Sequence, residues 1–270
     1  MNEPVRRTGS GLEFYEVDGK HKALVDLETH VVTSKKQRDA YRRKKELEEL
    51  GIQGRTRSFV LCFHDPIRAL MGRLTLDEMG ALIKLLPYLK YGEAGDLVHQ
   101  GKRMDKAAIG KAIGKKQRQT AAILSKLTKE GALIAKKEGR KSVYAVAKEI
   151  HTMGEAGGNM FTKLFQTYAK KQLEKLTTQQ AGVLYALLPF FHYRDYILAV
   201  NPNETDDDLI EPMNIEEVGK MLGISKASAY RHIGALTREG IMLETRAYGV
   251  STFYVNPDFM FRATRGNEFT

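Results

Sequence analysis

The chain of 270 residues has a single cysteine, no tryptophan and no long apolar run. Because Cys62 is alone, the chain cannot form an internal disulfide or a zinc site built from several cysteines. No segment approaches the roughly 18 to 20 apolar residues that a membrane-spanning helix needs. The N-terminal stretch MNEPVRRTGSG also lacks the apolar core of a secretory signal. We therefore expect a cytoplasmic protein with no membrane partner.

Acidic residues are also in deficit, with 33 Asp and Glu against 43 Lys and Arg, for a net charge of +10. Such a surplus favours a polyanionic partner, either nucleic acid or an acidic membrane surface. A basic soluble protein without such a partner fits the charge equally well. With 42% apolar residues the chain can bury an ordinary core, and its length predicts about two domains.

An internal repeat is the most informative feature that the sequence does have. The shift between the copies is 102 residues at first and 109 residues after one length change. Three pairs of stretches match: RLTLDEMGALIKLLPYLKY (73–91) with KLTTQQAGVLYALLPFFHY (175–193), MDKAAIGKAIG (104–114) with MNIEEVGKMLG (213–223), and LSKLTKEGALI (124–134) with IGALTREGIML (233–243). So many identities with one length change predict a duplicated domain.

Each copy predicts the same elements. TLDE (75–78) and TTQQ (177–180) fit capping boxes at the start of a helix, and apolar residues then recur at helical spacing. Pro87 and Pro189 predict a kink or an early stop in these two helices.

The segment before each capping box is predicted to be extended. Asp65 and Pro66 suit the N-cap and first turn of a helix, so residues 59–63 precede that helix as extended chain. The counterpart FTKLF (161–165) looks helical by its own periodicity, but the repeat favours an extended segment there too.

Further along, each copy predicts a short helix, a glycine-centred turn, a second helix and two strands. In the first copy these are the turn IGK (113–115), a helix over about 117–129 ending near Gly131, and strands ALIAKK (132–137) and SVYAVA (142–147). In the second copy they are the turn LGI (222–224), a helix over about 226–238 ending near Gly240, and strands IMLETR (241–246) and STFYVN (251–256).

With this order of elements, residues 214–242 resemble the helix-turn-helix and following strand of bacterial winged-helix DNA-binding proteins. Apolar residues occupy the packing positions, namely Val218, Leu222, Ile224, Ala229 and Ile233. The second half is also similar to replication and regulatory proteins of phages and Firmicute plasmids. The first copy departs from the pattern at Lys115 and Thr120, where apolar residues are usual.

The resemblance covers residues 59–262 and implies an α+β, mainly α fold. It has two tandem winged-helix domains from an internal duplication, at 59–153 and 161–262, with a linker at 154–160 and a tail at 263–270. Residues 1–58 predict a β-hairpin around Asp18-Gly19 and then a helix over 34–51. Residues 35–45 hold seven Lys or Arg, so this basic helix either follows phosphates or is a charged surface helix.

A recognition helix reads DNA with the side chains of its N-terminal turns, because the major groove, about 12 Å wide, admits one helix. Arg231 suits a guanine edge, while Ser225 and Lys226 suit phosphates. The helical candidates are Lys116, Gln117, Arg118 and Gln119 in the first copy, and Ser225, Lys226, Ser228, Tyr230 and Arg231 in the second. The candidates in the hairpins, which could contact the DNA backbone or the minor groove, are Arg140, Lys141, Arg246 and Tyr248. Solvated faces without a partner are the alternative.

Signals for an enzyme are weak. GKAIGKK (110–116) has three residues between its glycines and lacks the Ser or Thr of a phosphate-binding loop. The acidic run 204–208 and the seven scattered histidines show no spacing typical of metal ligands. We expect no catalytic residues, no metal and no cofactor.

The resulting hypothesis is a sequence-specific double-stranded DNA-binding protein, associated with the bacterial nucleoid, that regulates transcription for a bacterium or a mobile element. The alternatives are a plasmid or phage replication initiator or partition-type origin-binding protein, and a protein-interaction scaffold. A homodimer and contacts with RNA polymerase or replication proteins are compatible with this hypothesis. Since the two reading helices differ in sequence, their half-sites should differ as well.

Overall fold

The computed structural model describes residues 6–7, 13–17, 20–24, 58–92, 95–247 and 250–263. The chain forms two compact units, residues 1–56 and 57–270. The described residues have an α+β fold of helices and small antiparallel sheets. Among them, no helix has the length and apolar character needed to cross a membrane.

In the first unit, strands β1 (Arg6–Arg7), β2 (Glu13–Val17) and β3 (Lys20–Leu24) form an antiparallel sheet in that order. Val17 pairs with Lys20, which leaves a two-residue connection and confirms the predicted hairpin. Strand β1 was not predicted. The basic helix predicted over residues 34–51 lies outside the described residues.

The second unit contains both copies of the sequence repeat, with the same order of main elements. The first copy has β4 (Phe59–Phe63), α2 (His64–Met71), α3 (Leu76–Leu85), η1 (Leu86–Tyr88), β5 (Val98–His99), β6 (Lys102–Arg103), α4 (Lys106–Ile113), α5 (Gln117–Lys129), β7 (Leu133–Glu138), β8 (Lys141–Val146) and β9 (His151–Thr152). The second has β10 (Phe161–Phe165), α6 (Gln166–Leu173), α7 (Thr178–Leu187), η2 (Leu188–Phe190), η3 (Asp207–Leu209), α8 (Ile215–Leu222), α9 (Lys226–Arg238), β11 (Met242–Ala247), β12 (Val250–Val255) and β13 (Met260–Ala263).

Local chemistry explains most of these boundaries. Both predicted capping boxes are present at the starts of α3 and α7, and both helices tighten into a 3-10 turn at the predicted prolines. The glycines at the ends of α4 and α8, Gly114 and Gly223, adopt the left-handed conformation at φ 70° and 64°. One helix start was wrong: the N-cap of α2 is Phe63 rather than Asp65, so the helix begins at His64. Pro66 is tolerated in the first turn because its missing N–H would have no partner there. The four hairpin strands each lie one residue from their predicted bounds.

A four-stranded sheet in the order β13-β10-β4-β9 joins the copies. At its centre β4 and β10 pair antiparallel, and Leu61 pairs with Lys163, its equivalent 102 residues later. On the two sides, Cys62 pairs with His151 and Leu164 pairs with Met260. His151 and Met260 are 109 residues apart, which is the second shift of the sequence repeat. The strand pairing is therefore reciprocal between the copies.

Helices α3 and α7 cross at two equivalent glycines. A Cβ atom at Gly80 would lie 1.7 Å from the carbonyl oxygen of Thr178, and one at Gly182 would lie 1.9 Å from that of Leu76. Leu76 and Thr178 are themselves equivalent, so this close approach is reciprocal and needs glycine at both positions.

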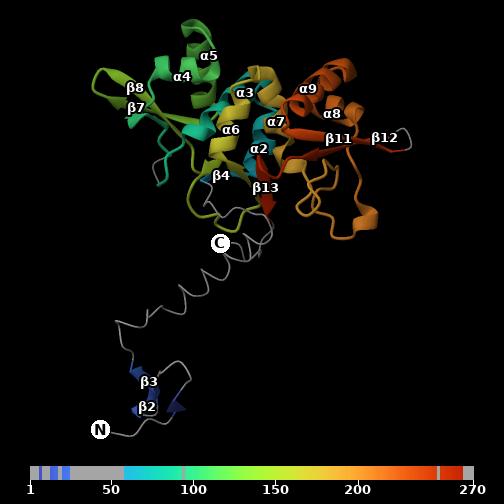
Figure 1. Ribbon diagram of the computed structural model, residues 1–270. Helices are drawn as coiled ribbons and strands as arrows, with labels where there is room; N and C mark the ends of the chain where they lie inside the picture. Colours follow the sequence, from blue (N-terminus) through green and yellow to red (C-terminus); the bar gives the residue numbers. More distant parts are fainter. Residues whose placement is uncertain are drawn as a thin grey trace. The chain divides into compact units, whose positions relative to one another are not determined.

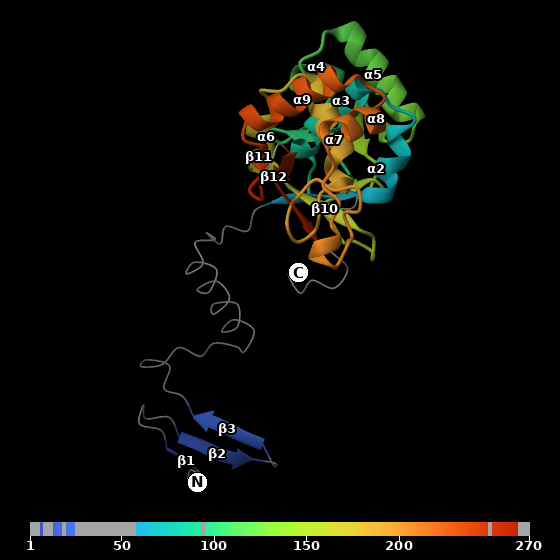
Figure 2. The same cartoon turned by 90° about the vertical axis from the view of Figure 1, so that its right-hand side faces the viewer.

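The side chains of the second unit bury one hydrophobic core to which both copies contribute. Residues 154–160, which were predicted as a linker between two domains, therefore connect copies that share a core. In Figures 1 and 2, α3 and α7 lie between α5 and α9, and the sheet with β4, β10 and β13 lies on the opposite side of the unit from α5.

Candidate nucleic-acid interface

Helix α5 turns its apolar side to the core and its first turn to solvent. Ile123, Leu124 and Leu127 are buried, whereas the predicted residues Lys116, Gln117, Arg118 and Gln119 are all exposed. None of these four side chains has a hydrogen bond or ion pair with another described residue. Lys116 is the N-cap and makes no capping bond with its side chain, so the first amides of α5 also lack a side-chain acceptor.

The two departures from the usual pattern in the first copy have structural partners. Lys115 lies 2.8 Å from the carboxylate of Asp77, which also accepts a hydrogen bond from the hydroxyl of Thr178 in the other copy. Burial acts to raise the pKa of Asp77, but hydrogen bonds from Lys115 and Thr178 outweigh it and lower this pKa. The buried hydroxyl of Thr120 donates to the carbonyl of Lys116 at 3.0 Å. Both polar residues thus stabilise the turn before α5.

A groove of about 610 Å³ lies between α4, α5 and β8 of the first copy. Four lysines line it: Lys106, Lys111, Lys115 and Lys141. Lys115 and Lys141 have carboxylate partners, but Lys106 and Lys111 have none among the described residues. The second copy has Ile215, Ile224 and Val250 in place of Lys106, Lys115 and Lys141. The lysine cluster therefore belongs to the first copy alone.

The hairpin of the first copy carries the predicted residues Arg140 and Lys141 at and beside its tip. Arg140 is exposed between β7 and β8. Lys141 is 73% exposed and lies 3.1 Å from Asp105, the N-cap of α4. This ion pair sets the hairpin against α4, and the lysine-lined groove runs between them.

In the second copy, several predicted residues are engaged in contacts within the protein. Ser225 caps α9 by accepting a hydrogen bond from the amide of Ser228 at 3.2 Å. Lys226 lies 3.6 Å from Glu216. Tyr230 is 56% exposed. In contrast to Ser225 and Lys226, Arg231 is exposed without a polar partner among the described residues.

The hairpin of the second copy contacts its helix. Arg246 donates to Glu244 at 2.9 Å, and hydrogen bonds with Glu244 and Tyr230 raise the pKa of Arg246. Arg246 therefore connects the hairpin to α9 through Tyr230. The remaining predicted residue, Tyr248, lies outside the described residues.

The predicted residues thus form two clusters, one on each copy, which differ in their charge. The first has an uncovered helix start beside a lysine-lined groove. In the second, Arg231 is exposed without a carboxylate partner among the described residues, whereas Lys226 and Arg246 are exposed but paired with Glu216 and Glu244. Lys106 and Lys111 were missed from the sequence. For Lys106 the signal was present, because a residue-by-residue comparison of the two copies sets it against Ile215. Lys111 is matched by Lys220 in the second copy, so this comparison gives no signal for it.

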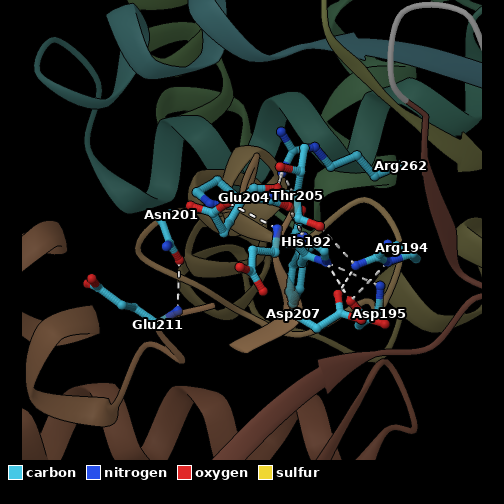
Figure 3. Close-up of polar contacts among 12 residues, drawn as sticks. His192, Arg194, Asp195, Asn201, Glu204, Thr205, Asp207, Glu211 and Arg262 are labelled. Atoms are coloured by element: carbon cyan, nitrogen blue, oxygen red, sulfur yellow. Dashed lines mark hydrogen bonds and ion pairs between the residues drawn. The ribbon is translucent and has the colours of Figure 1, made fainter. Parts of the chain in front are cut away.

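The acidic run 204–208 is held by contacts of its own loop, as Figure 3 shows. The carboxylate of Glu204 accepts from the amide of Thr205 at 2.7 Å, and Asp207 pairs with Arg194. Arg262 of β13 is buried and donates to the carbonyl of Pro202 at 2.9 Å. Within the part of the chain that the structure describes, no three His, Cys, Asp or Glu side chains gather where they could hold a metal ion.

Comparison of the chain with protein-family models, with curated proteins and with solved structures finds no match. The functional assignment therefore depends on the geometry of the two clusters.

Proposed function

We propose that the protein is a sequence-specific double-stranded DNA-binding protein that regulates transcription for a bacterium or a mobile element. In this proposal, residues 59–153 and 161–262 are two winged helices that arose by duplication. Each would have its helix-turn-helix at α4–α5 or α8–α9 and its wing at β7–β8 or β11–β12. The left-handed glycines between the helices and the hairpins that follow them support this assignment.

One observation carries the proposal: α5 and α9 both pack on the shared core and both leave polar residues of their N-terminal turns uncovered. A helix that enters the major groove needs such a face, because its N-terminal side chains contact the base edges. Had the two copies packed these faces against each other, the residues could not meet a duplex. The copies pack instead through β4, β10, α3 and α7.

The two clusters suit different tasks on the duplex. Lys106 and Lys111 beside the uncovered start of α5 suit phosphate oxygens, which fix the protein's position on DNA. Gln117, Gln119 and Arg231 have side chains that can pair with base edges, Gln with adenine and Arg with guanine. Contacts with the DNA phosphates would then be concentrated in the first copy, whereas both copies would contact base edges.

The salt dependence of binding tests the proposal. The full chain is titrated against fluorescent duplexes of mixed sequence and of sequence recovered from co-purifying DNA. If six or more phosphates are contacted, affinity should fall about 10³-fold or more between 50 and 200 mM salt. Absent or salt-insensitive binding would contradict the proposal and favour a protein-interaction scaffold. Recovered sequences at promoters would support a regulator, whereas repeated sites at an origin would replace it with a replication initiator.

A further inference from the structure

The contacts between the copies are reciprocal, as they are around a two-fold axis. At the centre of the β4–β10 pair, Leu61 lies opposite its equivalent Lys163. Arg68 of α2 lies 5.4 Å from the ring centroid of Phe190, and its equivalent Lys170 lies 4.8 Å from that of Tyr88, the equivalent of Phe190. Together with the two glycine contacts of α3 and α7, these pairs have the pattern of an isologous dimer interface. The single chain therefore carries an approximate internal two-fold axis.

This axis relates the two exposed helices and holds them in fixed positions. It passes through the β4–β10 pair and the α3–α7 crossing, with α5 and α9 on its two sides (Figures 1 and 2). Bonds between the copies restrict sliding: buried Lys84 donates to the carbonyl of Leu176 at 2.6 Å, and Asp77 connects Lys115 to Thr178. We call α5 with its hairpin β7–β8, and α9 with its hairpin β11–β12, the two heads. They are not separated by a flexible tether, because both copies share one core.

We infer that one chain binds an inverted pair of unlike half-sites at a single spacing. This inference rests on the proposed DNA binding and names the architecture of its target. A duplex has two-fold axes perpendicular to its length, so two heads related by a two-fold axis meet half-sites that run in opposite directions. The half-sites differ because Tyr230 and Arg231 of α9 correspond to Ala121 and Ala122 of α5. In α5 the candidate reading residues are instead Gln117, Arg118 and Gln119, in the first turn.

Selection from a random library of 40-bp duplexes by the full chain supplies the test sequence. We expect a bipartite motif. Reversing one half-site, or inserting 5 or 10 bp between the halves, should lower affinity about 100-fold or more, towards that of a single half-site. Equal affinity after reversal, a motif with one half-site, or recovery of binding with 10 bp inserted would each overturn the inference. Failure to select or bind any duplex would instead overturn the proposed function.

A symmetrised variant gives an independent readout of direction. It carries Gln117→Lys, Arg118→Ala, Gln119→Ser, Ala121→Tyr and Ala122→Arg, so that α5 presents the side chains of α9. None of these five positions is buried. Selection with this variant should recover two identical halves in inverted order, whereas identical halves in direct order would overturn the inference. If the variant does not fold, the reversed half-site remains decisive for the natural chain.

Discussion

The substitution Gly80→Ala tests the close approach of α3 and α7 on which the arrangement of the two copies depends. The added Cβ atom would lie 1.7 Å from the carbonyl oxygen of Thr178, whereas ordinary contact begins at 3.4 Å. The two helix backbones must therefore separate by roughly 1.7 Å, the difference between these distances. A gap of even 0.5–1 Å already forfeits a quarter to a half of the dispersion attraction between the atoms that line it.

Overpacking of this kind costs about 3 kcal/mol at the upper end of the usual range. Alanine recovers about 1 kcal/mol of helix propensity relative to glycine. We therefore expect a net loss of about 2 kcal/mol in the free energy of unfolding, measured by urea denaturation. Adding Gly182→Ala should cost less than a second 2 kcal/mol, because the helices are already apart.

Gly234→Ala in α9 is the matched control. It has the same chemistry, but no atom within 4 Å of the added Cβ. This variant should be more stable than the natural chain by up to about 1 kcal/mol. If Gly80→Ala also raised stability, the close approach of α3 and α7, and with it the fixed relation of the two heads, would be refuted.

Three further predictions concern the candidate interface and the core. Lys106→Glu with Lys111→Glu should weaken binding and reduce the slope of log affinity against log salt by about 2, whereas Lys220→Glu, at a lysine already paired with Glu216, should change it less. Arg231→Ala should cost about 1–3 kcal/mol on the selected duplex and relax one base preference, and an equal loss on random DNA would show a phosphate contact instead. Burial lowers the pKa of His64 to about 2 and of His151 to about 3, so both remain neutral in the fold while the unfolded chain binds protons below pH 6.5. Stability measured in urea should thus be complete above pH 6.5 and fall towards pH 5 by up to about 1.4 kcal/mol per pH unit for each histidine, and a flat profile would contradict their burial.

The local structure could be predicted because each helix start and end depends on residues within a few positions of it. The boundaries of α5 and α9 match the prediction at both ends, since a turn glycine precedes each helix and a glycine follows it. The repeat also predicted correctly that residues 161–165 are extended, where periodicity alone indicated a helix. One copy supplied the proline signal that the other lacked, so the pair carried more information than either sequence by itself.

The relation between the copies could not be predicted, because the contacts that fix it connect residues about a hundred positions apart. Gly80 and Gly182 match in the alignment, but the sequence does not show that each faces the other helix. The division of roles between the two clusters was also hidden. Lys226 and Arg246 were equal candidates with Lys116 and Arg118 until their carboxylate partners, Glu216 and Glu244, were visible.

Because the two copies lie in one chain and differ in sequence, a contact can exist on one side of the two-fold axis and be absent from the other. A symmetric dimer of identical copies would repeat every contact on both sides. The bridge from Lys115 through Asp77 to Thr178 has Ile224, Gln179 and Leu76 at the equivalent positions, so it exists on one side of the axis only. The turn lysine is thereby committed to the fold, and Lys141 is partly committed through Asp105. Of the four groove lysines, Lys106 and Lys111 are then the two without a carboxylate partner among the described residues, and in the proposed function they meet the polyanion. Lys115 thus serves the contact between the copies, while Lys106 and Lys111 line the positive groove beside it.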